Sequence, residues 1–165
     1  MPRQSGDSPY AFTVPPSVDA VPAARDRVVR RAQRLGLILD EDDLRLLTGE
    51  VIANSVTHTQ AACVVSVRCI GERLRVEVTD ADPTLVHPSQ ADVMDENGRG
   101  LFLVAALATA WGSQPCAAGK KTWFELAVSA SVVDTAAVAA SQADDAAEES
   151  LSITGAQLRI EQRAA

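Results

Sequence analysis

The sequence predicts an α+β fold, because helical and strand patterns occupy separate blocks along the chain. Residues 19–36 and 40–58 carry apolar side chains at helical spacing. Residues 65–78 and 111–128 alternate apolar and polar side chains on both sides of a glycine-containing turn, which is typical of β-hairpins. With 165 residues, the chain is long enough for one domain with a hydrophobic core and additional terminal segments.

The N-terminal part is expected to consist of flexible residues 1–9 followed by a short edge strand. Tyr10, Phe12 and Val14 alternate with smaller residues, as side chains on the two faces of a strand do. The folded domain is therefore expected to cover residues 10–128.

Two helices are expected to follow this strand. The first begins near Asp19 and Pro22, since proline is tolerated in a first helical turn, and Gly36 is expected to end it. Asp40 can cap the second helix, and three acidic residues follow it where the helix dipole favours negative charge. The second helix is expected to run to about His58.

The stretch between the two predicted hairpins is expected to form a long loop and a third helix. Residues 81–97 include two prolines and show no sustained period, which is typical of a functional or mobile loop. Residues 100–110 are apolar nearly all round, and we expect them to form a buried helix. The predicted order is helix, helix, hairpin, loop, helix, hairpin.

Charge and composition exclude several classes of function. The formal net charge is −7 and no segment gathers Lys and Arg densely, so a direct nucleic-acid partner is not expected. Without a long apolar run or a secretion signal, we expect no membrane span and a cytoplasmic location. Residues 129–165 are rich in Ala, Ser, Asp and Glu, and are expected to form a flexible acidic tail.

The cysteines are expected to be reduced core residues. Cys63 and Cys69 lie on one predicted strand, about 20 Å apart at 3.3 Å per residue, which is too far for a disulfide. Cys116 is the third cysteine. Only two histidines are present and the chain shows no short regular spacing of metal ligands, so a zinc site is not expected.

Glu50 and Asn54 lie one turn apart, inside the apolar arc of the second predicted helix. Both side chains are therefore expected to be at least partly buried. A buried carboxylate is costly unless it is paired or holds a ligand, which favours a binding site. The alternative is a helix face that lines a groove open to water, and the E-x-x-x-N pattern alone favours this alternative.

Two further motifs strengthen the case for a binding site. Asp80 ends an alternating strand, where it is either a buried acceptor for an exocyclic amine or an ordinary turn residue. Gly98, Arg99 and Gly100 precede an apolar helix, whose free backbone N–H groups and positive dipole end are suited to phosphate. A G-x-G pattern alone is a weak signal.

In this order the motifs resemble those of the GHKL ATPase superfamily over about residues 10–128. The matching residues are Glu50, Asn54, Asp80-Ala81-Asp82-Pro83 and Gly98-Arg99-Gly100-Leu101. Within the superfamily the chain is similar to the bacterial anti-sigma factor serine-protein kinases, in the short form of actinobacteria, whose final strands match residues 120–126. The resemblance implies a two-layer sandwich, the Bergerat ATP-binding fold, in which about three helices cover one face of a mixed or antiparallel sheet.

The resemblance also implies roles for individual residues. Glu50 would be the general base for the attacking hydroxyl, and Asn54 would ligate a Mg²⁺ ion that bridges the phosphates of ATP. Asp80 would accept the adenine amine, and Thr122 would lie near the adenine. The residues that would hold phosphates in the lid are Gly98, Arg99, Gly100 and Leu101. His58 is either a site residue or a packing residue.

The implied function is an ATP-dependent serine/threonine-protein kinase that phosphorylates an anti-sigma factor antagonist of the STAS type and otherwise binds a sigma factor. A homodimer is expected by analogy. The alternatives are a module in which ATP sets partner choice without phosphoryl transfer, and a scaffold without nucleotide. The block Asp80-Ala81-Asp82-Pro83 stands where many relatives have Asp-x-Gly-x-Gly, and Asp82-Pro83 is therefore expected to make a stiffer entrance to the lid.

Overall fold

The computed structural model describes residues 10–86 and 96–130 of the chain. The strands are β1 (Tyr10–Val14), β2 (Leu37–Ile38), β3 (Cys63–Ile70), β4 (Arg73–Asp80), β5 (Ala110–Cys116), β6 (Gly119–Ala127) and β7 (Ser129–Ala130). The helices are the 3₁₀ turn η1 (Val18–Ala20), α1 (Val21–Arg34), α2 (Glu41–Thr59) and α3 (Glu96–Leu107). None of the helices in these ranges is long and apolar enough to cross a membrane.

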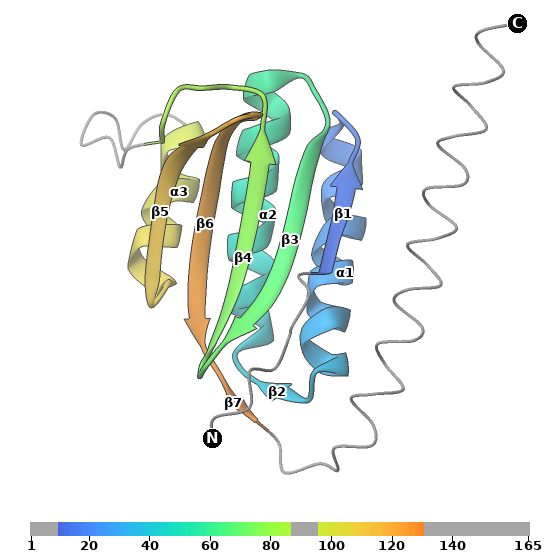
Figure 1. The fold of residues 1–165 in the computed structure, drawn as a ribbon, viewed down its shortest axis with the longest axis vertical. Helices are drawn as coiled ribbons and strands as arrows, with labels where there is room; N and C mark the ends of the chain where they lie inside the picture. The colour runs from blue at the N-terminus through green and yellow to red at the C-terminus, as the bar shows by residue number, and fades with distance from the viewer. Residues whose placement is uncertain (1–9, 87–95, 131–165) are drawn as a thin grey trace, which may run out of the picture.

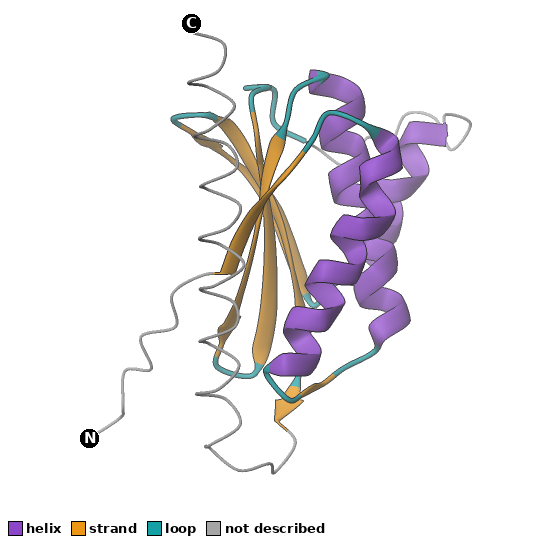
Figure 2. Cartoon of the chain, turned by 90° about the vertical axis from the view of Figure 1, so that its right-hand side faces the viewer, coloured by secondary structure: helices purple, strands orange, loops and turns teal. Residues whose placement is uncertain are grey.

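The predicted two-layer α+β sandwich is confirmed. Five strands form one antiparallel sheet in the order β1-β3-β4-β6-β5 (Figure 1). Figure 2 shows that α1, α2 and α3 lie against the same face of this sheet. The core lies between the two layers, and the other face of the sheet carries no helix in the described part of the chain.

Capping residues explain where the first two helices begin. Ser17 Oγ accepts a hydrogen bond from the Asp19 N–H at 3.2 Å and caps η1, so α1 begins at Val21, slightly later than predicted. Gly36 takes a left-handed φ of 64° just after α1, as its predicted role as a stop requires. Asp40 caps α2 as predicted, because its Oδ1 accepts from two backbone N–H groups, each at 3.0 Å.

The hydrophobic core follows the predicted helical stripe and strand alternation. α1, one side of α2 and one face of the sheet supply its largest fully buried side chains, which include Val28, Val29, Leu44, Leu47, Ile52, Val65, Val67, Leu74, Val76, Val78 and Phe124. Because alternate residues of each strand point to this core, polar residues on the same face of β4 and β6 become buried too. Three of these buried polar residues, Asp80, Lys120 and Thr122, belong to the candidate site.

The prediction of a buried third helix is wrong in its bounds and in its burial. α3 begins at Glu96 and ends at Leu107, and Phe102 on it is 70% exposed while Val104 is fully buried. α3 is the outermost helix of its layer and contacts α2 and the edge strand β5 on one side (Figure 1). Residues 87–95, the remainder of the predicted loop, lie outside the described residues, as do residues 1–9 and 131–165.

A second, very small sheet was not predicted. β2 pairs with β7 in antiparallel orientation, with Leu37 opposite Ala130 and Ile38 opposite Ser129. The Val128 N–H also donates to the Glu72 carbonyl at 2.9 Å, which holds the end of β6 to the β3–β4 turn. Two-residue strands are too short to show a period, so no sequence pattern predicts them.

The open face of the sheet carries an ion-pair network. Glu77 Oε1 accepts from Arg75 Nε at 2.8 Å and from Arg68 at 3.0 Å, and Glu77 Oε2 pairs with Lys121 at 2.9 Å. Glu125 also pairs with Arg75, at 2.9 Å. Burial acts to raise the pKa of Glu77, but hydrogen bonds from Lys121 and Arg75 outweigh it and hold this pKa below its usual value. The Lys121 side chain therefore lies on the open face of the sheet, away from the helices.

The expectation of three core cysteines holds only for Cys63, which is 1% exposed, whereas Cys69 and Cys116 are partly exposed. Burial, followed by the negative charge of Asp80, raises the pKa of the Cys63 thiol from 9.0 to about 11. The protonated thiol is the form that the fold favours. Its contribution to stability is therefore complete below pH 9 and is lost as the pH rises towards 11.

We expect Cys63 to react with iodoacetamide at pH 8 at least about 100-fold more slowly than an exposed thiol. The raised pKa lowers its thiolate fraction by about this factor, since each pKa unit is tenfold. Peptide mass spectrometry over a time course would measure this rate, with Cys116 as the internal reference. Equal labelling rates for the two cysteines in the native protein would contradict the prediction.

Candidate functional site

Glu50 and Asn54 lie on α2, and both side chains are partly buried, as predicted. The Glu50 carboxylate lies against Gly100 on α3. A Cβ at position 100 would overlap Glu50 Oε2 and would lie only 3.1 Å from Glu50 Cδ. Gly100 therefore leaves the space that this carboxylate occupies, and the structure brings two of the predicted site residues into contact.

The Gly98-Arg99-Gly100 motif lies inside α3 and does not form a loop before it. Because α3 begins at Glu96, Gly98 and Arg99 belong to its first turn, whose backbone N–H groups have no partner within the helix. Gly100 follows on the side that faces Glu50, and Leu101 is partly buried. The start of α3 therefore combines amide donors that have no partner within the helix with a glycine that admits a carboxylate.

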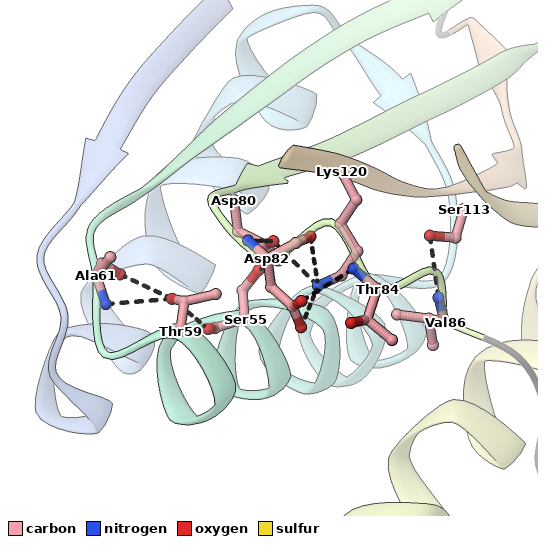
Figure 3. A network of polar contacts seen from close by, with 9 residues as sticks. All are labelled: Ser55, Thr59, Ala61, Asp80, Asp82, Thr84, Val86, Ser113 and Lys120. Carbon is pink, nitrogen blue, oxygen red and sulfur yellow. Dashed lines mark hydrogen bonds and ion pairs between the residues drawn. The ribbon is translucent and has the colours of Figure 1, made fainter. Parts of the chain in front are cut away.

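Asp80 lies at the end of β4 and is 2% exposed. Its Oδ1 accepts from the Asp82 N–H and from Lys120 Nζ, each at 3.0 Å (Figure 3). Its Oδ2 accepts a short hydrogen bond from the Ser55 hydroxyl on α2. Asp80 is thus a buried acceptor and not an exposed turn residue.

Lys120 was not singled out from the sequence, although it is one of the most buried polar residues. Its side chain is 3% exposed and its ammonium also contacts Asp82, at 3.2 Å from Oδ2 and 3.4 Å from the carbonyl oxygen (Figure 3). In the alternation of β6, Lys120 falls on the same face as Phe124, which points to the core. That placement is the signal that could have identified it.

Glycine at position 119 allows Lys120 to reach Asp80. Gly119 has φ 143°, and a Cβ there would overlap the Asp80 carbonyl oxygen and lie 2.6 Å from the Ala81 carbonyl carbon. These are backbone atoms and cannot move aside easily. The first residues of β6 can therefore pack directly on the end of β4, with Lys120 in register opposite Asp80.

Polar contacts also fix residues 81–86, the entrance to the loop. Asp82 Oδ1 accepts from the Thr84 N–H at 2.9 Å, and the Val86 N–H donates to Ser113 Oγ on β5 at 3.3 Å (Figure 3). The hydrogen bonds from Thr84, and then the contact with Lys120, hold the pKa of Asp82 below its usual value. Asp82 is therefore ionised, and it is the second negatively charged partner of Lys120 after Asp80.

A family model described as histidine kinase-like ATPase domain matches residues 14–126, well over half of the chain. The chain belongs to this family. No curated protein matches the chain. Membership in the histidine kinase-like ATPase domain family supports the GHKL resemblance and ATP binding, and the matched residues include all of β4, α2 and α3.

The remaining residues predicted for this histidine kinase-like ATPase domain are placed as follows. Thr122 is 2% exposed and lies two residues after Lys120 on the same face of β6, opposite Val78 and Ser113. This position is next to the Asp80 end of the site. His58 is exposed on α2, so the interpretation of His58 as a packing residue is wrong.

The residues of the histidine kinase-like ATPase domain fit a Mg²⁺ ion bound together with ATP. In residues 10–86 and 96–130, no group of three or more His, Cys, Asp or Glu side chains is placed to hold a metal ion. Mg²⁺ usually takes one or two protein oxygens and completes its shell with phosphate oxygens and water. The Asn54 carboxamide oxygen, one turn from Glu50, is a ligand of this type.

We expect Gly100→Ala to lower ATP turnover by at least about 10-fold while the free energy of unfolding changes by less than about 1 kcal/mol. The new methyl group displaces only the flexible end of Glu50, and alanine favours the helix. Turnover of Mg-ATP and urea denaturation would measure the two effects. Ala105→Ser, at an exposed position of α3, is the control, and equal turnover in both variants would contradict the prediction.

Proposed function

We propose that this chain is an ATP-dependent serine/threonine-protein kinase that phosphorylates an anti-sigma factor antagonist of the STAS type and otherwise binds a sigma factor. The observation that carries the proposal is the Glu50 carboxylate beside Gly100, at the start of α3. This arrangement puts a candidate general base next to backbone N–H groups that can donate hydrogen bonds to phosphate. The family match and the resemblance of residues 120–126 to the final strands of the anti-sigma factor kinases support it.

In the proposed reaction, the serine or threonine hydroxyl oxygen of the antagonist bonds to the γ-phosphorus of ATP as the bond to the ADP oxygen breaks. Glu50 accepts the proton of the attacking hydroxyl. The first backbone N–H groups of α3 stabilise negative charge on the phosphates. The Asn54 side-chain oxygen would hold a Mg²⁺ ion, which would supply charge neutralisation at the phosphates.

The adenine end of the proposed site is formed by β4, β6 and α2. Asp80 accepts a hydrogen bond from the exocyclic amine, while Ser55 and Lys120 hold the carboxylate in place. Thr122 lines the adjacent part of β6. Positioning at this end aligns the phosphates with Glu50, as phosphoryl transfer requires.

Two measurements test the proposal in sequence. Mg-ATP at 100 times its dissociation constant should stabilise the chain by about 2.7 kcal/mol, which a thermal shift assay detects. Incubation with labelled ATP, Mg²⁺ and candidate STAS-type antagonists should then transfer label to a serine or threonine. No thermal shift would favour a scaffold without nucleotide, and a shift without label transfer would favour a non-catalytic binding module.

A further inference from the structure

The Lys120 ammonium is saturated by contacts within the protein. A lysine has three N–H donors, and three oxygens surround this one, namely Asp80 Oδ1 at 3.0 Å, Asp82 Oδ2 at 3.2 Å and the Asp82 carbonyl at 3.4 Å. At 3% exposure the side chain has no solvent-facing alternative. Lys120 therefore has no donor left for a ligand, and it acts on a ligand only through Asp80.

The Asp80 carboxylate is nearly saturated as well. Two carboxylate oxygens offer about four acceptor positions. Oδ1 accepts from Lys120 and from the Asp82 N–H, and Oδ2 accepts from the Ser55 hydroxyl. Among the described residues these three donors leave one position, on Oδ2. A ligand group that presents a single donor fits this position.

Purine bases differ in the number of donors that they present. Adenine presents an amine donor beside a ring acceptor, whereas guanine presents two adjacent N–H donors. An aspartate with one free position on each oxygen can accept both guanine donors in parallel, as carboxylates accept bidentate pairs. With one position in total, one guanine donor would be buried without a partner, which weakens binding.

We propose that Lys120 is a specificity-determining residue, which favours adenine over guanine nucleotides by occupying the position on Asp80 that a second ligand donor would need. This inference rests on the proposed ATP-binding function and deepens it. Gly119 and the register between β4 and β6 hold Lys120 in place, so the restriction is part of the fold.

The test compares dissociation constants of Mg-ATP and Mg-GTP for the full chain and three variants by isothermal titration calorimetry. The wild type should bind ATP more tightly, and Lys120→Met should lower the ratio of GTP to ATP dissociation constants by about 10-fold. Lys120→Leu removes the same donor from Oδ1 and should lower the same ratio, and it decides the question if Lys120→Met does not fold. Lys121→Met is the matched control, because the neighbouring Lys121 lies on the open face and pairs with Glu77 at 2.9 Å.

The outcomes separate this inference from the proposed function. A wild-type chain that binds neither nucleotide would overturn both. A chain that binds ATP, with a ratio unchanged in whichever of Lys120→Met and Lys120→Leu folds, would overturn the role of Lys120 and leave ATP binding intact. Equal wild-type affinities for ATP and GTP, or an equal loss of selectivity in Lys121→Met, would also overturn it. A purely structural role would change overall affinity and leave the ratio constant.

Discussion

Asp80→Ala is expected to lower the free energy of unfolding by about 3 kcal/mol and to weaken ATP binding by about 100-fold. Removing one partner of a buried ion pair leaves an uncompensated charge, and such changes cost about 3–5 kcal/mol. Lys120 keeps its contacts with Asp82, whose side chain is 30% exposed, so the lower end of this range applies. The loss of affinity follows because a hydrogen bond to a charged acceptor disappears.

Urea denaturation and nucleotide titration would measure these two effects of Asp80→Ala. Combining it with Lys120→Met should recover part of the lost stability, because both charges are then removed, but it should not recover ATP binding. Asp26→Ala is the control for a surface ion pair, since Asp26 and its partner Arg45 are 48% and 41% exposed, and little change is expected. If Asp80→Ala were as stable as Asp26→Ala, the buried pair would not stabilise the fold as described.

Glu50→Ala is expected to retain ATP binding while phosphoryl transfer falls by about 10²–10⁴-fold. General bases contribute rate factors of this size, and Glu50 is the carboxylate beside the start of α3. Its partial burial implies that the fold does not depend on it, so the melting temperature should change little. This prediction rests on the proposed kinase function.

Label transfer from Mg-ATP to a STAS-type antagonist would measure the effect, alongside the thermal shift that ATP produces. Glu50→Gln keeps the size of the side chain and should be equally impaired, because the amide cannot accept the proton. Glu41→Gln, exposed at the start of the same helix, should behave as the wild type. Label transfer at the wild-type rate in Glu50→Ala would remove Glu50 from the mechanism.

Much of the fold could be predicted because its determinants are local. The Asp40 cap, the Gly36 stop and the alternation of the paired strands are patterns within a few residues, and each is confirmed. The exposure of α3 could not be predicted in the same way. Phe102 is exposed because α3 is the last helix of its layer, which is a property of the tertiary arrangement and not of the apolar pattern.

The candidate site likewise contains residues that could be selected from local sequence patterns and contacts that depend on the tertiary arrangement. Glu50, Asn54 and Asp80 could be selected because a polar residue in an apolar arc or at a strand end is unusual within its own segment. The alternation of β6 places Lys120 on the core face, but its contact with Asp80 could not be predicted, because it depends on the pairing of β6 with β4, which brings together residues 40 positions apart. The short hydrogen bond between Ser55 and Asp80 likewise joins two segments that show no joint pattern in the sequence.

The pairing of β2 with β7 fixes the position of Ala130, the last residue that the structure describes. β4 runs from Arg73, opposite Ala127, to Asp80, opposite Lys120, so β7 lies at the far end of the sheet from the proposed adenine pocket, about 23 Å away along the strand (Figure 1). A fluorescent reporter or a surface tether attached beyond Ala130 would therefore start away from the nucleotide. This end of the domain is a suitable attachment point for immobilised binding assays in which the pocket must stay accessible.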